Sequence, residues 1–147
     1  EAVEDLAHVL FMKGEYDEAE PLNSKILEIR KRTLGEEDPL TLKAIEDLVH
    51  VLKGKAHELE MKDEYDEAEP LRRRCLEIRE RALGEEDPLI LESLEGLAHA
   101  LVMKGEYDEA DPFFRKILEI RERTLGERDP LTLEISEYLA LLSKLRE

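Results

Sequence analysis

The stretch from Tyr65 to Pro88, YDEAEPLRRRCLEIRERALGEEDP, occurs three times in this 147-residue chain with few changes. The first copy, from Tyr16 to Pro39, reads YDEAEPLNSKILEIRKRTLGEEDP, and the third, from Tyr107 to Pro130, reads YDEADPFFRKILEIRERTLGERDP. Such close repetition predicts one supersecondary unit that is stacked several times. Each unit then buries its apolar face against its neighbours.

The composition predicts that this unit is helical. Hydrophobic and charged residues each make up 41% of the chain, and chains rich in Ala, Glu, Lys, Leu and Arg form helices or coiled coils. A long coiled coil would not tolerate the Gly and Pro that recur in every copy. We therefore expect an all-α helical-repeat solenoid, a single array over residues 1–147. Its expected parts are a first repeat at about 1–37, a second at 38–86, a third at 87–128 and a C-terminal capping helix at 129–147.

Short motifs predict the helix ends. Asp38 followed by Pro39 is typical of an N-cap and first helical position, and the same pair recurs at residues 87–88 and 129–130. Gly35, like Gly84 and Gly126, is expected to provide a left-handed C-terminal cap. Asp17 with Glu20 resembles a capping box. The helix that follows is expected to bury a stripe of apolar residues: Ala19, Leu22, Ile26, Ile29 and either Thr33 or Leu34.

The middle repeat carries an insertion. Tyr65 follows Tyr16 by 49 positions (65 − 16), whereas Tyr107 follows Tyr65 by only 42 (107 − 65). Seven extra residues add two helical turns with a drift of about 20°. One interpretation is a single long helix, whose Leu52, Ala56 and Leu59 would pair with a second molecule; the other is a break near Gly54. The long helix is favoured, because no cap or terminator surrounds the glycine.

The charge limits the partners. With 22 basic and 38 acidic residues the net charge is −16, so nucleic acid and anionic membrane surfaces would be repelled. Basic partners are favoured over acidic ones. No signal peptide and no membrane-length apolar run is present in the sequence, and a cytoplasmic location is expected.

No reactive cluster predicts an enzyme, and no metal or cofactor is expected. The lone Cys75 corresponds to Ile26 (75 − 49) and Ile117 (75 + 42), which indicates a buried hydrophobe. His50 and His57 are about 10.5 Å apart along one helix, too far to share a zinc ion. Histidines that tune binding with pH are an alternative to ordinary surface residues. The Phe113-Phe114 pair in the third repeat is expected either to anchor an interface or, more commonly, to pack on the terminal helix.

The pattern L-A-x-x-L-x-x-x-G-x-Y-x-E-A-E-P-L, followed by L-E-I-R-E-R-x-L-G-E-x-D-P, resembles tetratricopeptide repeats of the 42-residue kind found in kinesin light chains. The matching residues include Leu6, Ala7, Gly14, Tyr16, Ala19 and Pro21, with equivalents in the later copies. The resemblance implies a right-handed superhelix whose first helices line a concave peptide-binding groove. The groove residues that it implies are Glu4, His8, Phe11, Glu46, His50, His57, Glu95, His99 and Val102.

The sequence departs from that family at the groove. Where relatives carry Asn or Lys that hold a peptide, this chain has Glu and His, so the expected ligand is a basic or apolar peptide. The resemblance thus implies a non-catalytic protein–protein interaction module. The alternative is an engineered or consensus-like scaffold with no evolved ligand, which forms a homo-oligomer through the extended middle helix or the open ends of the array.

Overall fold

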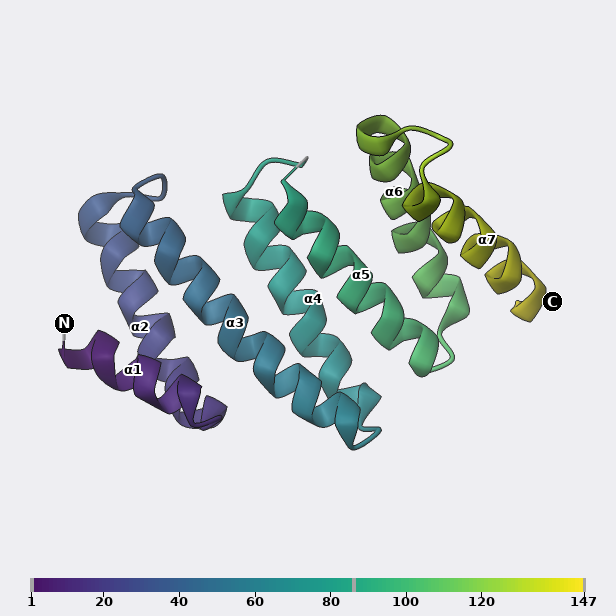
Figure 1. Cartoon of the computed structure of the whole chain (residues 1–147). Helices are drawn as coiled ribbons and strands as arrows, with labels where there is room; N and C mark the ends of the chain where they lie inside the picture. The colour runs from purple at the N-terminus through teal and green to yellow at the C-terminus, as the bar shows by residue number, and fades with distance from the viewer. Residues whose placement is uncertain (1, 86, 147) are drawn as a thin grey trace. The chain divides into compact units, whose positions relative to one another are not determined.

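The computed structural model describes residues 2–85 and 87–146, and the regular elements in those ranges are all α-helices (Figure 1). The predicted all-α fold is confirmed. The helices are α1 Ala2–Met12, α2 Tyr16–Leu34, α3 Pro39–Met61, α4 Tyr65–Ala82, α5 Pro88–Met103, α6 Tyr107–Leu125 and α7 Pro130–Leu145. In these described ranges, no helix is long and apolar enough to cross a membrane.

The chain divides into two compact units, and the boundary between them lies between Leu83 and Gly84. In the first unit α1, α2, α3 and α4 pack in sequence order, and in the second unit α5, α6 and α7 do the same. Below, α1, α3, α5 and α7 are called the first helices, and α2, α4 and α6 the second helices. The single array and its superhelical twist stay predictions, and the expected boundary at residue 86 lies outside the described residues.

The Asp-Pro pairs start three first helices as predicted. Asp38 accepts a hydrogen bond from the backbone N–H of Leu40 at 2.9 Å, and the N-caps of α5 and α7 repeat this bond at the same distance. The expected capping box at Asp17 and Glu20 is wrong. Helix α2 already begins at Tyr16, and Glu15 at its N-cap makes no side-chain cap bond.

Glycine ends only two of the second helices. Gly35 has φ 93° and Gly126 has φ 92°, values that favour glycine, although their ψ angles of 164° and 160° lie outside the left-handed helical region. The expectation for Gly84 is wrong, because α4 stops earlier, at Ala82, and extended Leu83 is its cap.

Helix α3 is continuous through Gly54, so the long-helix interpretation is confirmed. It has 23 residues and α5 has 16, and the difference equals the seven-residue insertion (23 − 16). The expectation that Leu52 and Ala56 pair with a second molecule is wrong, because both are completely buried. Leu59 is half-buried, and pairing through it stays a prediction.

The inserted turns are joined to the first repeat. A Cβ atom placed on Gly54 would lie 2.4 Å from Cζ of the Tyr16 ring, so the glycine leaves room for that ring against α3. At the next residue of α3, the Lys55 ammonium binds Asp17 at 2.9 Å and Glu20 at 3.0 Å. The two carboxylates that were expected to cap α2 therefore bind α3 instead.

We expect Gly54→Ala to lower the free energy of unfolding by about 1 kcal/mol, because overpacking against Tyr16 outweighs the gain in helix propensity. In a Tyr16→Ala background the same substitution should raise the free energy of unfolding by about 1 kcal/mol, since the ring is gone. Urea unfolding followed by circular dichroism measures both changes. Stabilisation in both backgrounds would show that the ring moves aside freely.

The buried stripe of α2 differs from the expected one. Ala19 is buried, but Ile29 is 41% exposed and Leu34 is 45% exposed, while Asn23 and Leu27 are buried. Helix α2 is contacted by both α1 and α3. These contacts bury Ala19, Asn23 and Leu27, which follow one another at a spacing of four and form one of the ridges along the helix.

Two predictions about core residues are confirmed. Cys75 is a buried hydrophobe in the cluster between α2, α3 and α4, and burial raises the pKa of its thiol to about 11. Phe114 packs on the terminal helix, with its ring centroid 4.8 Å from that of Tyr138.

Candidate functional site

A hollow of about 580 Å³ lies in the first unit between α1, α2 and α3. It contains four of the predicted groove residues: Glu4, His8 and Phe11 from α1, and His50 from α3. Asp5, Lys43 and Asp47 complete its polar rim, and Ala7, Val9, Asn23, Ile26, Arg30 and Val51 also line it. The two first helices therefore form the walls, and α2 forms the floor.

An aromatic group borders the hollow. The Phe11 ring lies 6.4 Å from the His50 ring and 5.8 Å from the Tyr16 ring, measured between ring centroids. Phe11 is half-buried and His50 is exposed. The arrangement holds Phe11 in place and leaves part of its ring open, so that the ring can act as an apolar anchor for a ligand.

Asn23 on the floor was missed by the sequence analysis. It is 7% exposed, and its side-chain N–H donates to the backbone oxygen of Ala19 at 3.0 Å. Its equivalents are Arg72 (23 + 49) and Phe114 (23 + 91). A position that holds an amide, a guanidinium and a ring in three close copies was the available signal of local specialisation.

Much of the charge in the hollow is neutralised within the chain. Glu4 forms an ion pair with Arg30, and Lys43 forms one with Asp47 at 3.2 Å. Asp5 and His8 are exposed at the rim. The local field is therefore only mildly acidic, in contrast to the net charge of −16 for the whole chain.

The three predicted glutamates share one structural role. Glu4, Glu46 and Glu95 form ion pairs with Arg30, Arg79 and Arg121, which occupy the same position of the LEIR motif in α2, α4 and α6. The Arg79 side chain is 1% exposed, and its Nε and Nη2 donate to the Glu46 carboxylate at 3.2 and 2.8 Å.

Two of these arginines also reach the next first helix. Arg30 donates to the backbone oxygen of Leu40 at 2.9 Å, and Arg121 donates to that of Leu131 at 3.1 Å. Each guanidinium thereby joins three successive helices.

Burial raises the pKa of Glu95. The negative charges of nearby Glu92 and Glu134 raise the pKa further, and the positive charge of Arg121 opposes both effects.

The other predicted groove residues do not join this hollow. His57 is exposed on α3, near its C-terminal end, and Glu46 does not line the hollow. Glu95, His99 and Val102 are on α5 in the second unit, where His99 is exposed and Val102 half-buried. Among the described residues, no group of three side chains is placed to bind a metal ion.

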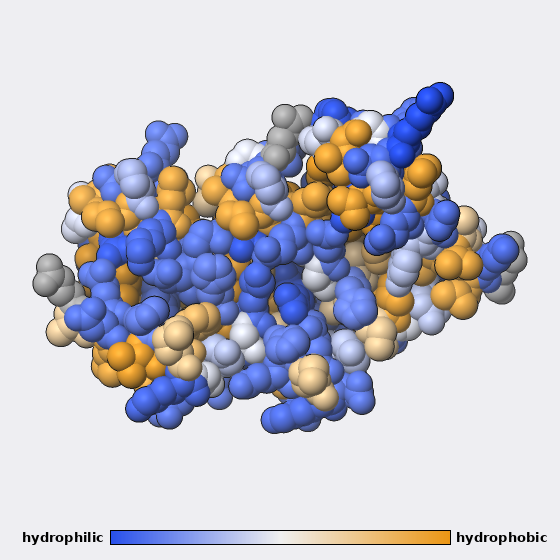
Figure 2. Space-filling model, viewed as in Figure 1, coloured by the Kyte–Doolittle hydropathy of each residue, from blue (hydrophilic) through white to orange (hydrophobic). Residues whose placement is uncertain are grey.

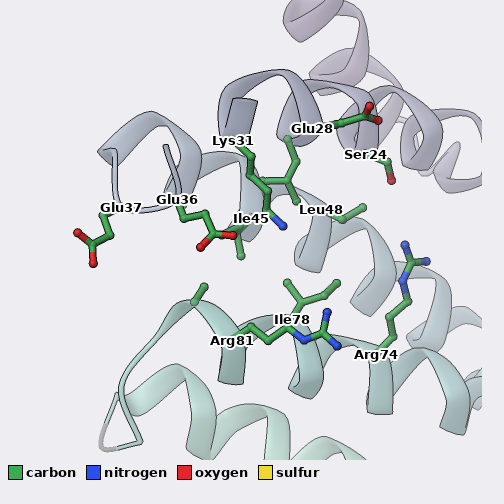
Figure 3. Close-up of a pocket in the computed structure, with 12 residues that line it drawn as sticks. Ser24, Glu28, Lys31, Glu36, Glu37, Ile45, Leu48, Arg74, Ile78 and Arg81 are labelled. Atoms are coloured by element: carbon green, nitrogen blue, oxygen red, sulfur yellow. The ribbon is translucent and has the colours of Figure 1, made fainter. Parts of the chain in front are cut away.

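A second hollow, of about 520 Å³, lies in the first unit between α2 and α4 (Figure 3). Leu27, Ile45, Leu48 and Ile78 provide apolar lining. In Figure 3, Lys31 reaches into it from α2, and Arg81 reaches toward it from α4. Glu28, Glu36 and Glu37 also line it, so both signs of charge surround the apolar part. The sequence analysis did not anticipate this hollow.

Comparison with known proteins identifies the repeat. Residues 2–40 and residues 51–123 match two sequence models, both described as tetratricopeptide repeat. Two solved structures cover 99% of this chain at 24% sequence identity and a TM-score of 0.54. The first is described as nearly identical TPR-like repeats of a kinesin light chain from Podosopora anserina. The second is the same protein with a single substitution.

That likeness concerns the fold alone. This chain spans 65% of the length of each of the two solved chains. It has no match among curated protein sequences.

Proposed function

This chain belongs to the tetratricopeptide repeat family, and on that premise we propose that it is a non-catalytic module that binds a peptide segment of a partner protein. The observation that carries the proposal is the hollow between α1, α2 and α3. It combines an apolar anchor at Phe11, an amide at Asn23 and ionisable groups at its rim, which are the elements of a small recognition site.

The proposed ligand is a basic or apolar peptide. The net charge of −16 attracts cations over long distances, and Asp5 places a carboxylate at the rim. Glu4 is engaged by Arg30, so it contributes less to this preference than its sequence position suggests. An apolar side chain of the ligand would lie against Phe11 and Ile26.

Filling the hollow tests this proposal. Asn23→Phe places a ring where the third repeat already has Phe114, so the fold has a precedent for it. Peptides that bind the unaltered protein would be selected from a random display library. Fluorescence anisotropy would then measure the affinity of each selected peptide for the unaltered protein and for the variant. We expect Asn23→Phe to weaken the selected peptides at least tenfold, which corresponds to about 1.4 kcal/mol.

The matched control changes an exposed residue beside the hollow. Met12→Ala alters a side chain of α1 that is 69% exposed and does not line the hollow, so binding should stay within about twofold. Circular dichroism verifies that both variants fold. Peptides that bind folded Asn23→Phe with full affinity would exclude this hollow as their site.

The alternative of a ligand-free scaffold makes a different prediction. Leu52 and Ala56 themselves are completely buried, so self-association of the scaffold would use other surfaces. A library selection that yields no peptide that binds reproducibly would favour the scaffold.

A further inference from the structure

The second hollow, between α2 and α4, is lined by two cations that have no ion-pair partner among residues 2–85 and 87–146. They are the Lys31 ammonium and the Arg81 guanidinium. The third cation of the lining, Arg74, differs from them, because it already binds Glu20 at 3.0 Å. Unpaired cations beside apolar surface attract an anion that brings apolar surface with it.

Two residues of this hollow depart from the repeat. Lys31 stands where the other second helices carry glutamate, at Glu80 (31 + 49) and Glu122 (31 + 91). Ala82 stands where they carry threonine, at Thr33 (82 − 49) and Thr124 (82 + 42). A carboxylate is thus replaced by an ammonium group and a hydroxyl by a methyl group in the lining of one hollow.

The inner surface of the second hollow is apolar. Leu27, Ile45 and Leu48 are 8%, 4% and 3% exposed, and Ile78 is half-buried. Orange atoms lie near the upper ends of α2, α3 and α4 in the space-filling view, with blue atoms around them (Figure 2). The volume of about 520 Å³ lies within the range of about 300–1,000 Å³ for small-molecule sites.

Carboxylates at the rim limit the charge of a ligand. Figure 3 shows Glu28 and Glu37 pointing away from the space between α2 and α4, whereas Glu36 reaches its edge beside Ile45. The middle of the hollow is therefore cationic and its edge is acidic. A singly charged anion fits this pattern better than a doubly charged phosphate, which the edge would repel more strongly.

The second hollow is distinct from the proposed peptide site. None of the described residues lines both hollows, and none of the predicted groove residues lines the second one. Its two walls are the second helices α2 and α4, whereas the predicted groove belongs to the first helices. A ligand in the second hollow would therefore lie beside the second helices and leave the groove open.

We propose that the second hollow binds a free fatty carboxylate of medium chain length. The Arg81 guanidinium and the Lys31 ammonium bind the carboxylate, since the planar fork of arginine matches its two oxygens. The unbranched apolar chain lies along Leu27, Ile78 and the methyl group of Ala82. This inference does not depend on the proposed peptide binding.

The probe is octanoate, and 1-octanol is its uncharged counterpart of the same chain length. Isothermal titration of the full chain should give saturable one-to-one binding of octanoate with a Kd of about 1 mM, as expected for so small a ligand. 1-Octanol should bind at least fivefold more weakly. Glu36→Gln should strengthen octanoate binding about twofold, because it removes a repelling charge at the edge.

Lys31→Glu should weaken octanoate binding at least tenfold. The fold has a precedent for this change, because both other copies carry glutamate at that position. Lys25→Glu is the matched control. It makes the same change of charge on α2, but Lys25 is exposed and lines neither hollow, so binding should stay within twofold at 0.15 M salt. Circular dichroism verifies that each variant folds.

Four outcomes would overturn the proposal. Octanoate that shows no saturable binding would remove the site. Equal losses in Lys31→Glu and Lys25→Glu would show that binding follows the net charge alone. Equal binding of 1-octanol would show that the cations do not take part. A large loss in Asn23→Phe would place octanoate in the hollow between α1, α2 and α3. Normal octanoate binding by that variant is expected, and it keeps this test separate from that of the proposed function.

Discussion

Arg79→Met should lower the free energy of unfolding by about 3 kcal/mol, far more than the same change at Arg30. The Arg79 side chain is 1% exposed and binds the Glu46 carboxylate through two nitrogens. Removing one partner of a buried ion pair leaves the other charge without compensation, at a cost of about 3–5 kcal/mol. The lower part of that range applies, because Glu46 remains 23% exposed and keeps some hydration.

Arg30 provides a matched control at the same repeat position. It binds Glu4, but the Arg30 side chain is 13% exposed and the Glu4 side chain 45% exposed, so water can replace much of the interaction. Arg30→Met should therefore cost about 1 kcal/mol, including the bond to Leu40. Urea denaturation of the full chain, followed by circular dichroism, measures both losses.

A double-mutant cycle shows whether the pair is responsible. Glu46→Met alone should also destabilise strongly, because it leaves the Arg79 guanidinium buried without its carboxylate. Adding Arg79→Met to Glu46→Met should then cost little more, which gives a coupling energy of about 2 kcal/mol. If the two losses simply add, the two side chains stabilise the unit by packing and not through each other.

These pairs change how the groove glutamates are interpreted. The resemblance to tetratricopeptide repeats assigns Glu4, Glu46 and Glu95 to a concave face, and the charge of the chain then suggests an acidic binding surface. Their arginine partners lie 26 or 33 residues later (30 − 4, 79 − 46 and 121 − 95), on the second helices. Replacing the glutamates would disturb helix packing before it tested a ligand.

Features that depend on a few neighbouring residues were predictable. The helix starts at the Asp-Pro pairs of Asp38, Asp87 and Asp129 follow from the geometry of a helix N-terminus, and the repeat shows the same motif three times. The continuity of α3 followed from the seven-residue spacing, which preserves the apolar face. The burial of Cys75 followed from its exchange with isoleucine.

Most features that depend on contacts between helices were not predictable. Gly54 looks like a weak point in a helix until Tyr16, 38 residues earlier (54 − 16), is seen against it. The buried stripe of α2 was misassigned, because two neighbouring helices and not the helix period alone select Asn23 and Leu27. The Glu–Arg pairs lay within reach of the repeat pattern, since both partners recur in register.

Alkaline pH should destabilise the protein through Cys75 by about 2 kcal/mol between pH 8 and pH 11, relative to Cys75→Val. Burial raises the pKa of the thiol from 9.0 to about 11. Folding therefore favours the protonated thiol, and the resulting stability is fully present below pH 9 and is lost as the pH rises through 11. A shift of about two units corresponds to about 2.7 kcal/mol, most of which is lost by pH 11.

The valine variant isolates this effect from other titrations. Tyr and Lys side chains also ionise in that range, but they do so equally in both proteins, and β-branched isoleucines already occupy the equivalent positions 26 and 117. Urea denaturation at intervals of half a pH unit gives the difference between the two curves. If the stability of the two proteins changes with pH in parallel, the thiolate of Cys75 forms in a hydrated site. Helix α4 would then have to separate from Val49 of α3 in the native state. In that case a thiol reagent should modify Cys75 of the folded chain nearly as fast as in urea, whereas the buried thiol should react at least about 100-fold more slowly.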